Sequence, residues 1–195
     1  MNLHSLPNLL TIGRIAAVPL VVGLFYWKSN PWAAPLAALV FILAAITDWV
    51  DGYLARKWGV TTPLGAFLDP VADKLMVATA LVLLVSKDPH WVIVVSAMVI
   101  VGREITVSAL REWMAHLGAR AKVAVSSLGK WKTILQMTGL SFMMYRNDLL
   151  GLPIYRLGVL LLVAAAVLTL WSMVSYMRAA WPELRGLPVR GPGEG

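Results

Sequence analysis

Apolar residues fill six long stretches of the chain, and short polar or proline-containing segments separate them. These stretches are Leu9–Trp27, Trp32–Tyr53, Pro70–Val85, Trp91–Leu110, Leu128–Tyr145 and Ile154–Met177. Most of them approach the roughly 20 apolar residues that an α-helix needs to cross a bilayer. Several end near a tryptophan, a residue that anchors helices at the membrane interface. The pattern predicts an all-α, polytopic membrane protein with six transmembrane helices.

Composition favours the same class of protein. Of the 195 residues, 59% are hydrophobic and 14% are charged, whereas about 25% are charged in an average soluble domain. These values exclude an ordinary soluble domain, a disordered chain and a coiled coil. We predict a single membrane domain over residues 1–181 and a disordered, Pro/Gly-rich tail over residues 182–195.

Basic residues are distributed unevenly between the two predicted sides of the membrane. Of the 17 lysines and arginines, 13 fall on the side that holds both termini. The positive-inside rule therefore places both termini in the cytoplasm. The same bias, together with attraction to anionic lipids, accounts for the net charge of +7. Because no nucleic-acid-binding motif accompanies this charge, we expect no nucleic acid partner.

Four of the ten acidic residues lie within 26 positions, where the second and third predicted helices meet the cytoplasmic face. They are Asp48, Asp51, Asp69 and Asp73. Helical spacing puts the first two on one face of one helix and the last two on one face of the next. Because the connection between the helices is short, we expect antiparallel neighbours whose acidic pairs face each other across a cleft.

Four carboxylates in one cleft repel each other, since a like pair 4 Å apart costs about 4 kcal/mol at an effective dielectric of 20. Cations or protons must offset this repulsion. The chain has no cysteine, and its three histidines lie elsewhere, so the ligands are all oxygen, which suits Mg²⁺, Mn²⁺ or Ca²⁺. Such a set can bridge two ions for phosphoryl transfer. Gly52, Ala55 and Gly65 let a ligand approach the backbone, and Arg56 can bind a pyrophosphate.

Each of these residues also has a purely structural explanation. Asp69 precedes Pro70 and can cap a helix N-terminus. Asp48 or Asp51 can pair with Arg56 or Lys57, and the glycines can serve helix packing. Together, these alternatives must also explain why four acidic residues share two facing stripes.

The spacing of eight of these residues resembles the signature of a known family. Asp48-x-x-Asp51-Gly52-x-x-Ala55-Arg56, eight further residues, and then Gly65-x-x-x-Asp69-x-x-x-Asp73 is similar to the motif of the CDP-alcohol phosphatidyltransferases, with no departure from it. Other segments resemble the bacterial branch of this family that uses glycerol 3-phosphate as the alcohol. These segments are Leu6–Thr11 with Arg14, Gly102–Trp113, Val123–Thr133 and Leu168–Met173.

The resemblance implies a reaction and roles for these residues. The family transfers a phosphatidyl group from CDP-diacylglycerol to an alcohol and releases CMP. It implies that Asp48, Asp51, Asp69 and Asp73 hold two divalent cations, Mg²⁺ or Mn²⁺, and that Asp73 is also the general base. Gly52, Ala55, Arg56 and Gly65 then line the CDP site, with Asn8 and Thr11 as further candidates. It also implies a homodimer in the bacterial cytoplasmic membrane, with membrane lipids around it and the active site facing the cytoplasm.

A phosphorylated acceptor requires clustered cations on the cytoplasmic side. The candidates for binding its phosphate are Arg103, Arg111, Lys130, Lys132, Lys122 and Arg14. Each can instead contact lipid headgroups as part of the positive-inside bias, and Arg14 can contact the nucleotide or order the first helix. Glu104 and Glu112 are expected to be ion-pair partners of the cations.

Two alternative functions remain open from the sequence. The same chemistry with serine, inositol or another alcohol changes only the acceptor. An ion-coupled transporter also uses membrane carboxylates, but the chain shows no pair of interrupted helices repeated in two halves.

Overall fold

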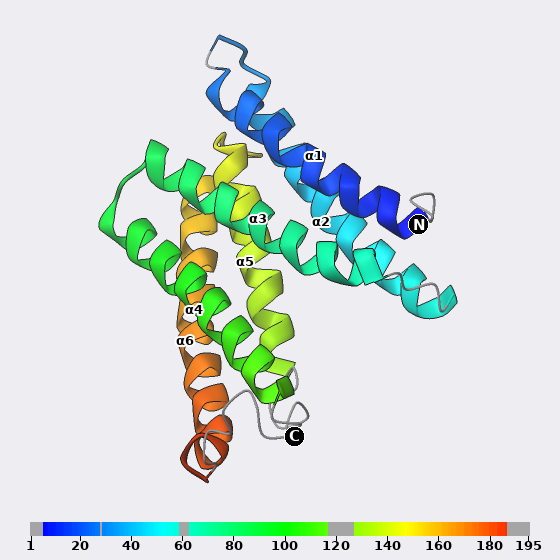
Figure 1. The fold of residues 1–195 in the computed structure, drawn as a ribbon. Helices are drawn as coiled ribbons and strands as arrows, with labels where there is room; N and C mark the ends of the chain where they lie inside the picture. The colour runs from blue at the N-terminus through cyan, green and yellow to red at the C-terminus, as the bar shows by residue number, and fades with distance from the viewer. Residues whose placement is uncertain (1–5, 28, 59–62, 117–126, 187–195) are drawn as a thin grey trace.

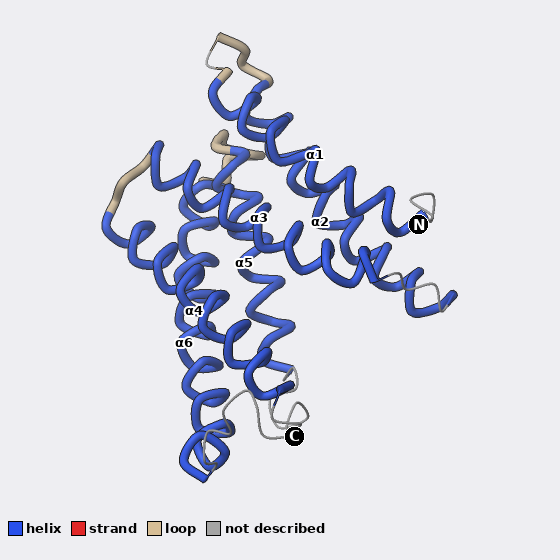
Figure 2. The backbone as a smooth tube through the Cα atoms, viewed as in Figure 1, coloured by secondary structure: helices blue, strands red, loops and turns tan. Residues whose placement is uncertain are grey.

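The computed structural model describes residues 6–27, 29–58, 63–116 and 127–186, and helices account for nearly all of them (Figures 1 and 2). The helices are α1 Leu6–Tyr26, α2 Ala33–Trp58, α3 Pro63–Lys87, α4 Trp91–His116, α5 Ser127–Tyr145 and α6 Ile154–Gly186. Apart from a lone bridge between Leu149 and Leu152, these ranges contain no β-structure. The prediction of an all-α fold with six helices is confirmed.

Helices α3 and α6 depart furthest from their predicted bounds. Helix α3 begins at Pro63. Proline is tolerated in the first turn of a helix, because an N–H group there has no partner within the helix. Pro70 lies inside the helix. Asp69 is therefore within a helix, and its explanation as an N-terminal cap is wrong. Helix α6 continues to Gly186, so residues 182–186 of the predicted disordered tail are helical. Residues 187–195 lie outside the described part of the chain.

Helix α1 brings α2 and α3 together. It packs along both of them, whereas α2 and α3 make few direct contacts (Figure 1). The expectation that a short connection makes α2 and α3 close neighbours is corrected here, because α1 provides the surface that they share. Helices α4 and α5 each pack on α6, and α5 also contacts α2. The acidic residues of α2 and α3 are thus linked through α1.

Apolar side chains occur both inside the bundle and on its outside. Phe41, Ile100 and Leu162 are completely buried. The most apolar 18-residue windows of helix α4 and of the segment Ile154–Trp181 have mean hydropathies of 1.9 and 2.5, and only 33% of each window is buried within the protein. Outward-facing residues such as Met98 and Trp171 are more than two-thirds exposed. These two helices are long and apolar enough to cross a membrane, and their outward faces suit contact with lipid.

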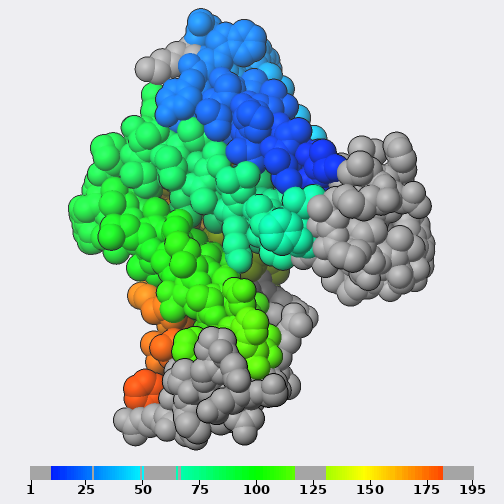
Figure 3. Space-filling model, viewed as in Figure 1, coloured from blue at the N-terminus to red at the C-terminus, as the bar shows by residue number. Residues whose placement is uncertain are grey.

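The molecule is elongated. In the space-filling view, α1 lies at one end, α3 and α4 form the middle, and the last part of α6 lies at the other end (Figure 3). The described connections between α1 and α2, α3 and α4, and α5 and α6 lie away from the residues where α1 begins and α6 ends (Figure 2). This arrangement is the one expected of helices that alternate in direction.

Helices α5 and α6 approach each other closely at a pair of glycines. A Cβ atom added to Gly158 would lie 2.8 Å from the carbonyl oxygen of Gly139 and 2.7 Å from Cγ of Met143. A Cβ atom added to Gly139 would lie 3.0 Å from the carbonyl oxygen of Gly158. Small residues allow such contact between helices in membrane proteins.

We expect Gly158→Ala to destabilise the protein by about 1–3 kcal/mol, the usual cost of overpacking a well-packed contact. Thermal unfolding in detergent measures the change. Gly23→Ala is the matched control, because an added Cβ there meets nothing within 4 Å among the described atoms. Equal Tm values for the two variants would contradict the close packing of α5 on α6.

Candidate active site

Arg14 connects carboxylates from two different helices. From α1, its guanidinium forms an ion pair with Asp48 of α2, and its Nη2 lies 3.8 Å from Oδ1 of Asp69 on α3. Thr11, one turn earlier on α1, donates a hydrogen bond from Oγ1 to the same oxygen of Asp69 (2.5 Å). Arg14 and Thr11 are both buried. The structure therefore brings Asp48 and Asp69 to one cationic group, across 34 and 55 positions of sequence.

A large cavity extends from Arg14 and Asp48 into the apolar part of the bundle. It has a volume of about 550 Å³ and is lined by α1, α2, α3 and α5. Arg14, Asp48 and Asp73 contribute charged groups to its lining. Most of the rest is apolar, including Ile42, Met76 and Phe142. Such a lining suits a molecule with a charged head and a hydrocarbon tail.

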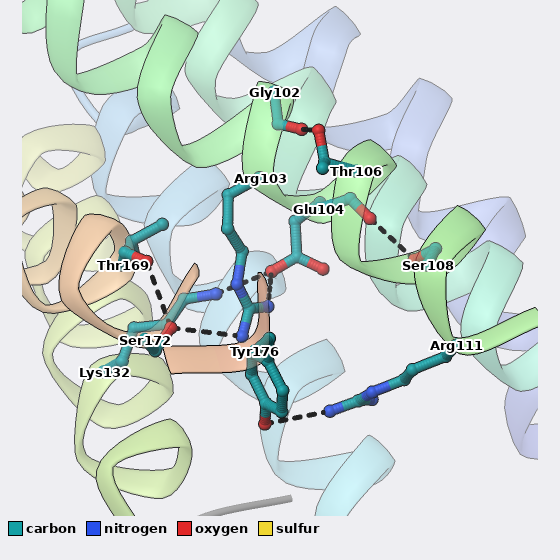
Figure 4. Close-up of polar contacts among 10 residues, drawn as sticks. All are labelled: Gly102, Arg103, Glu104, Thr106, Ser108, Arg111, Lys132, Thr169, Ser172 and Tyr176. Carbon is teal, nitrogen blue, oxygen red and sulfur yellow. Dashed lines mark hydrogen bonds and ion pairs between the residues drawn. The ribbon is translucent and has the colours of Figure 1, made fainter. Parts of the chain in front are cut away.

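A second cluster of charges lies where α4, α5 and α6 meet (Figure 4). Oε1 of Glu104 is 3.0 Å from Nη1 of Arg103 and 2.6 Å from Nζ of Lys132. Arg103 and Lys132 are buried, with 8% and 3% of their surfaces exposed. Glu104 is therefore an ion-pair partner of two cations, as predicted.

Tyr176 of α6 positions both arginines of α4. Its hydroxyl accepts a hydrogen bond from Nη2 of Arg111 (3.2 Å). The guanidinium carbons of Arg103 and Arg111 lie 5.6 and 5.3 Å from the centre of its ring, within the range of cation–π attraction. Ser172, one turn earlier on α6, accepts a hydrogen bond from Nη2 of Arg103 (Figure 4).

This second cluster carries excess positive charge. Arg103, Arg111 and Lys132 supply three cations, and Glu104 supplies the one carboxylate that pairs with them in the described residues. The Nε atoms of Arg103 and Arg111 are buried without a hydrogen-bond partner there. A cluster with surplus charge and unused donors is suited to bind a phosphate group.

Asp73 links the two regions. A small polar cavity of about 30 Å³ lies between α3, α4 and α5 and is lined by Asp73, Glu104 and Lys132, among others. Asp73 also lines the large apolar cavity. Its carboxylate is attracted by Arg14 on one side and by Lys132 on the other, and Glu104 repels it.

The predicted site residues fall into three groups. Asp48, Asp69, Thr11 and Arg14 lie together, and Gly65 is buried on α3. Arg103, Arg111 and Lys132 lie together in the second cluster, so the structure separates Arg14 from the other predicted phosphate ligands. Lys122 lies outside the described residues, as do the side chains of Asn8, Asp51, Gly52, Ala55, Arg56 and Lys130.

The carboxylates fit a divalent cation in their chemistry. Oxygens of Asp48 and Asp69 converge from two helices on one cationic group, and oxygen donors suit Mg²⁺ or Mn²⁺. Among the described side chains, no three acidic residues or histidines are close enough to form a complete ligand group. The described side chains of the motif thus offer oxygen atoms of the kind a hard metal ion uses, and the side chain of Asp51 is not among those described.

Comparison with known proteins decides the family. The model of the CDP-alcohol phosphatidyltransferases matches residues 4–171. The chain belongs to this family. The resemblance seen in the sequence is confirmed, and the matched range includes Asp48, Asp69 and Asp73.

Curated CDP-alcohol phosphatidyltransferase relatives match nearly the whole chain. CDP-diacylglycerol–glycerol-3-phosphate 3-phosphatidyltransferases of Salmonella choleraesuis (strain SC-B67) and Pectobacterium atrosepticum are 47% and 49% identical to it over 180 residues. Each match covers 92% of this chain and 97% of the relative. A cardiolipin synthase (CMP-forming) of Oryza sativa subsp. japonica is 50% identical over 194 residues, and the match spans 92% of this chain but 58% of the rice protein.

Proposed function

We propose that the protein transfers the phosphatidyl group of CDP-diacylglycerol to sn-glycerol 3-phosphate, which gives phosphatidylglycerol phosphate and CMP. The position of Asp73 carries this proposal. Asp73 lines both the cavity suited to a lipid and the small cavity that holds Lys132. The names of the bacterial relatives, with nearly full coverage of both chains, support the same donor and acceptor.

The donor is proposed to lie in the large cavity. Its acyl chains contact the apolar walls of α2, α3 and α5, and its pyrophosphate lies near Asp48, Asp69 and Arg14. Gly52, Ala55, Arg56, Gly65, Asn8 and Thr11 are the proposed nucleotide contacts. Members of the family generally depend on divalent metals, and we propose two, Mg²⁺ or Mn²⁺, on Asp48, Asp51, Asp69 and Asp73. Bound there, they offset charge on the pyrophosphate and on departing CMP.

The acceptor is proposed to bind between Asp73 and the second charged cluster. Arg103, Arg111 and Lys132 hold its phosphate, with Lys130 and Lys122 as further candidates. Asp73 accepts the proton of the attacking hydroxyl. The hydroxyl oxygen then bonds to the phosphorus that carries diacylglycerol, and the bond from that phosphorus to CMP breaks.

The site has to meet both a lipid and a water-soluble substrate. We propose that all six helices span the bacterial cytoplasmic membrane with both termini in the cytoplasm, so that the carboxylates lie at the cytoplasmic interface. The uneven distribution of basic residues supports this orientation. A homodimer remains part of the proposal through the family resemblance.

The rice relative supports a second candidate function. Because its name is cardiolipin synthase (CMP-forming), phosphatidylglycerol is an alternative acceptor. It carries a glycerol head, as glycerol 3-phosphate does, but it reaches the site from the membrane. The cations of the second cluster favour glycerol 3-phosphate as the acceptor. Its phosphate monoester carries up to two negative charges, whereas the phosphodiester of phosphatidylglycerol carries one, so it offsets more of the excess positive charge.

An acceptor assay tests these functions. The detergent-purified protein is given CDP-diacylglycerol with Mg²⁺ or Mn²⁺, and CMP release is measured with glycerol 3-phosphate, phosphatidylglycerol, serine or inositol. We expect release with glycerol 3-phosphate that EDTA abolishes. Release with another acceptor alone would keep the chemistry and overturn the acceptor. Folded protein inactive with every acceptor would overturn the proposed transferase function.

We expect Arg111→Ala to raise the KM for glycerol 3-phosphate about tenfold or more, since hydrogen bonds to charged groups contribute about 1.5–3 kcal/mol. The KM for CDP-diacylglycerol should change little. Arg178→Ala, which removes an exposed arginine of α6, is the control. An unchanged acceptor KM in Arg111→Ala would assign Arg111 to lipid headgroups instead.

A further inference from the structure

Gln136 is a buried amide that the proposed roles leave unused. It lies on α5 with 4% of its surface exposed. Its Oε1 atom has no hydrogen-bond partner anywhere in the described part of the protein. Burying an amide oxygen without a hydrogen-bond partner costs about 1–3 kcal/mol. We therefore expect this oxygen to accept a hydrogen bond from a bound ligand during the reaction.

The location of Gln136 indicates what that ligand is. It lines the small polar cavity together with Asp73, Glu104 and Lys132. It also follows Lys132 by four residues on α5, which places the two side chains on one face of the helix, one turn apart. The cavity volume of about 30 Å³ exceeds the roughly 10–15 Å³ that one water-sized group needs. The cavity can therefore admit a hydroxyl group.

The other carboxylate of this cavity is engaged by cations. Oε1 of Glu104 lies within hydrogen-bond distance of both Arg103 and Lys132. Asp73 is assigned to the attacking hydroxyl under the proposed function. Oε1 of Gln136 is therefore a buried, uncharged acceptor in this cavity that can accept a hydrogen bond from a further hydroxyl group.

Glycerol 3-phosphate presents three polar groups on a three-carbon chain. Its phosphate matches the cations, and its terminal hydroxyl matches Asp73. The hydroxyl on C2 lies between these two groups, as Gln136 lies beside both Lys132 and Asp73 in the lining of the cavity. We propose that Gln136 binds the C2 hydroxyl of the acceptor and makes the enzyme selective for a vicinal diol phosphate; this inference rests on the proposed function.

A substrate that lacks only this hydroxyl tests the proposal. The probe is 3-hydroxypropyl phosphate, which keeps the phosphate and the terminal hydroxyl. We expect the wild-type kcat/KM to be about 10- to 100-fold lower with the probe than with glycerol 3-phosphate, because the probe leaves Gln136 unpaired. In Gln136→Met, a side chain of similar length without the amide, we expect this ratio to fall to within about threefold.

The comparison of ratios separates binding of the hydroxyl from a structural role. A merely structural Gln136 would lower activity with both acceptors by the same factor and leave their ratio unchanged, which would overturn the proposal. Gln136→Asn, which withdraws the amide by one methylene, should also reduce the ratio if the Met variant fails to fold. Ser96→Ala, which alters another buried polar residue on α4, should retain the wild-type ratio.

Wild-type protein also distinguishes failure of this inference from failure of the proposed function. Activity with glycerol 3-phosphate and equal activity with the probe would overturn the role of Gln136 alone. Folded protein that releases no CMP with glycerol 3-phosphate would overturn the proposed function, and the role of Gln136 with it.

Discussion

Asp73→Asn is expected to lower kcat about a hundredfold to ten-thousandfold, the range that a positioned general base contributes. Asparagine keeps the size of the side chain but cannot accept the proton of the acceptor hydroxyl. The protein should still fold, because the substitution removes one negative charge from a site where several carboxylates repel each other. CMP release under saturating substrates measures the effect, and thermal unfolding in detergent verifies folding.

Asp148→Asn provides the matched control for this substitution. Asp148 is exposed in the connection between α5 and α6, and its replacement should leave kcat near the wild-type value. Near wild-type turnover in Asp73→Asn would show that another group accepts the proton. It would also remove the main argument for placing the reaction between the two cavities.

Lys132→Met is expected to raise the KM for glycerol 3-phosphate about 10- to 100-fold, with little change in the KM for CDP-diacylglycerol. Lys132 is the most buried cation of the second cluster, with 3% of its surface exposed. A charged contact to phosphate in such surroundings contributes about 1.5–3 kcal/mol. Methionine retains most of the apolar stem, so the loss reports mainly on the charge. Initial rates across a range of each substrate separate the two KM values.

Lys87→Met controls for the removal of a lysine. Lys87 is exposed at the last turn of α3, and its loss should change neither KM. Equal increases in both KM values for Lys132→Met would indicate general damage to the bundle. An unchanged acceptor KM would exclude Lys132 from phosphate binding.

Helical periodicity was enough to predict part of the acidic cluster. Asp69 and Asp73 are one turn apart on α3, as the spacing indicates, and Arg14 of α1 brings Asp48 of α2 close to Asp69. The part played by α1 was not predictable in this way. Arg14 reaches Asp48 across 34 positions, and no local pattern specifies which helix packs between two others.

Three polar residues of the site gave weak sequence signals. Gln136, Ser172 and Tyr176 each occur within or at the edge of an apolar stretch, where one polar or aromatic residue is compatible with simple packing. The only available hint for Gln136 was its spacing of four residues from Lys132. The prediction that α3 begins at Pro70 is also wrong. A proline often begins a helix, but α3 begins at Pro63 and contains Pro70 in its interior.

The charges of the site are divided along the chain. The carboxylates assigned to the donor lie on α2 and α3, before residue 88, and the cations and amide assigned to the acceptor lie on α4 and α5, after residue 90. Under the proposed function, natural selection can therefore alter the choice of alcohol through substitutions in the second half alone. The carboxylates assigned to CDP-diacylglycerol would be inherited unchanged with the first half, and α5 would still supply one wall of the donor cavity. Exchanging the last three helices between family members is thus a direct route to an enzyme with a new acceptor.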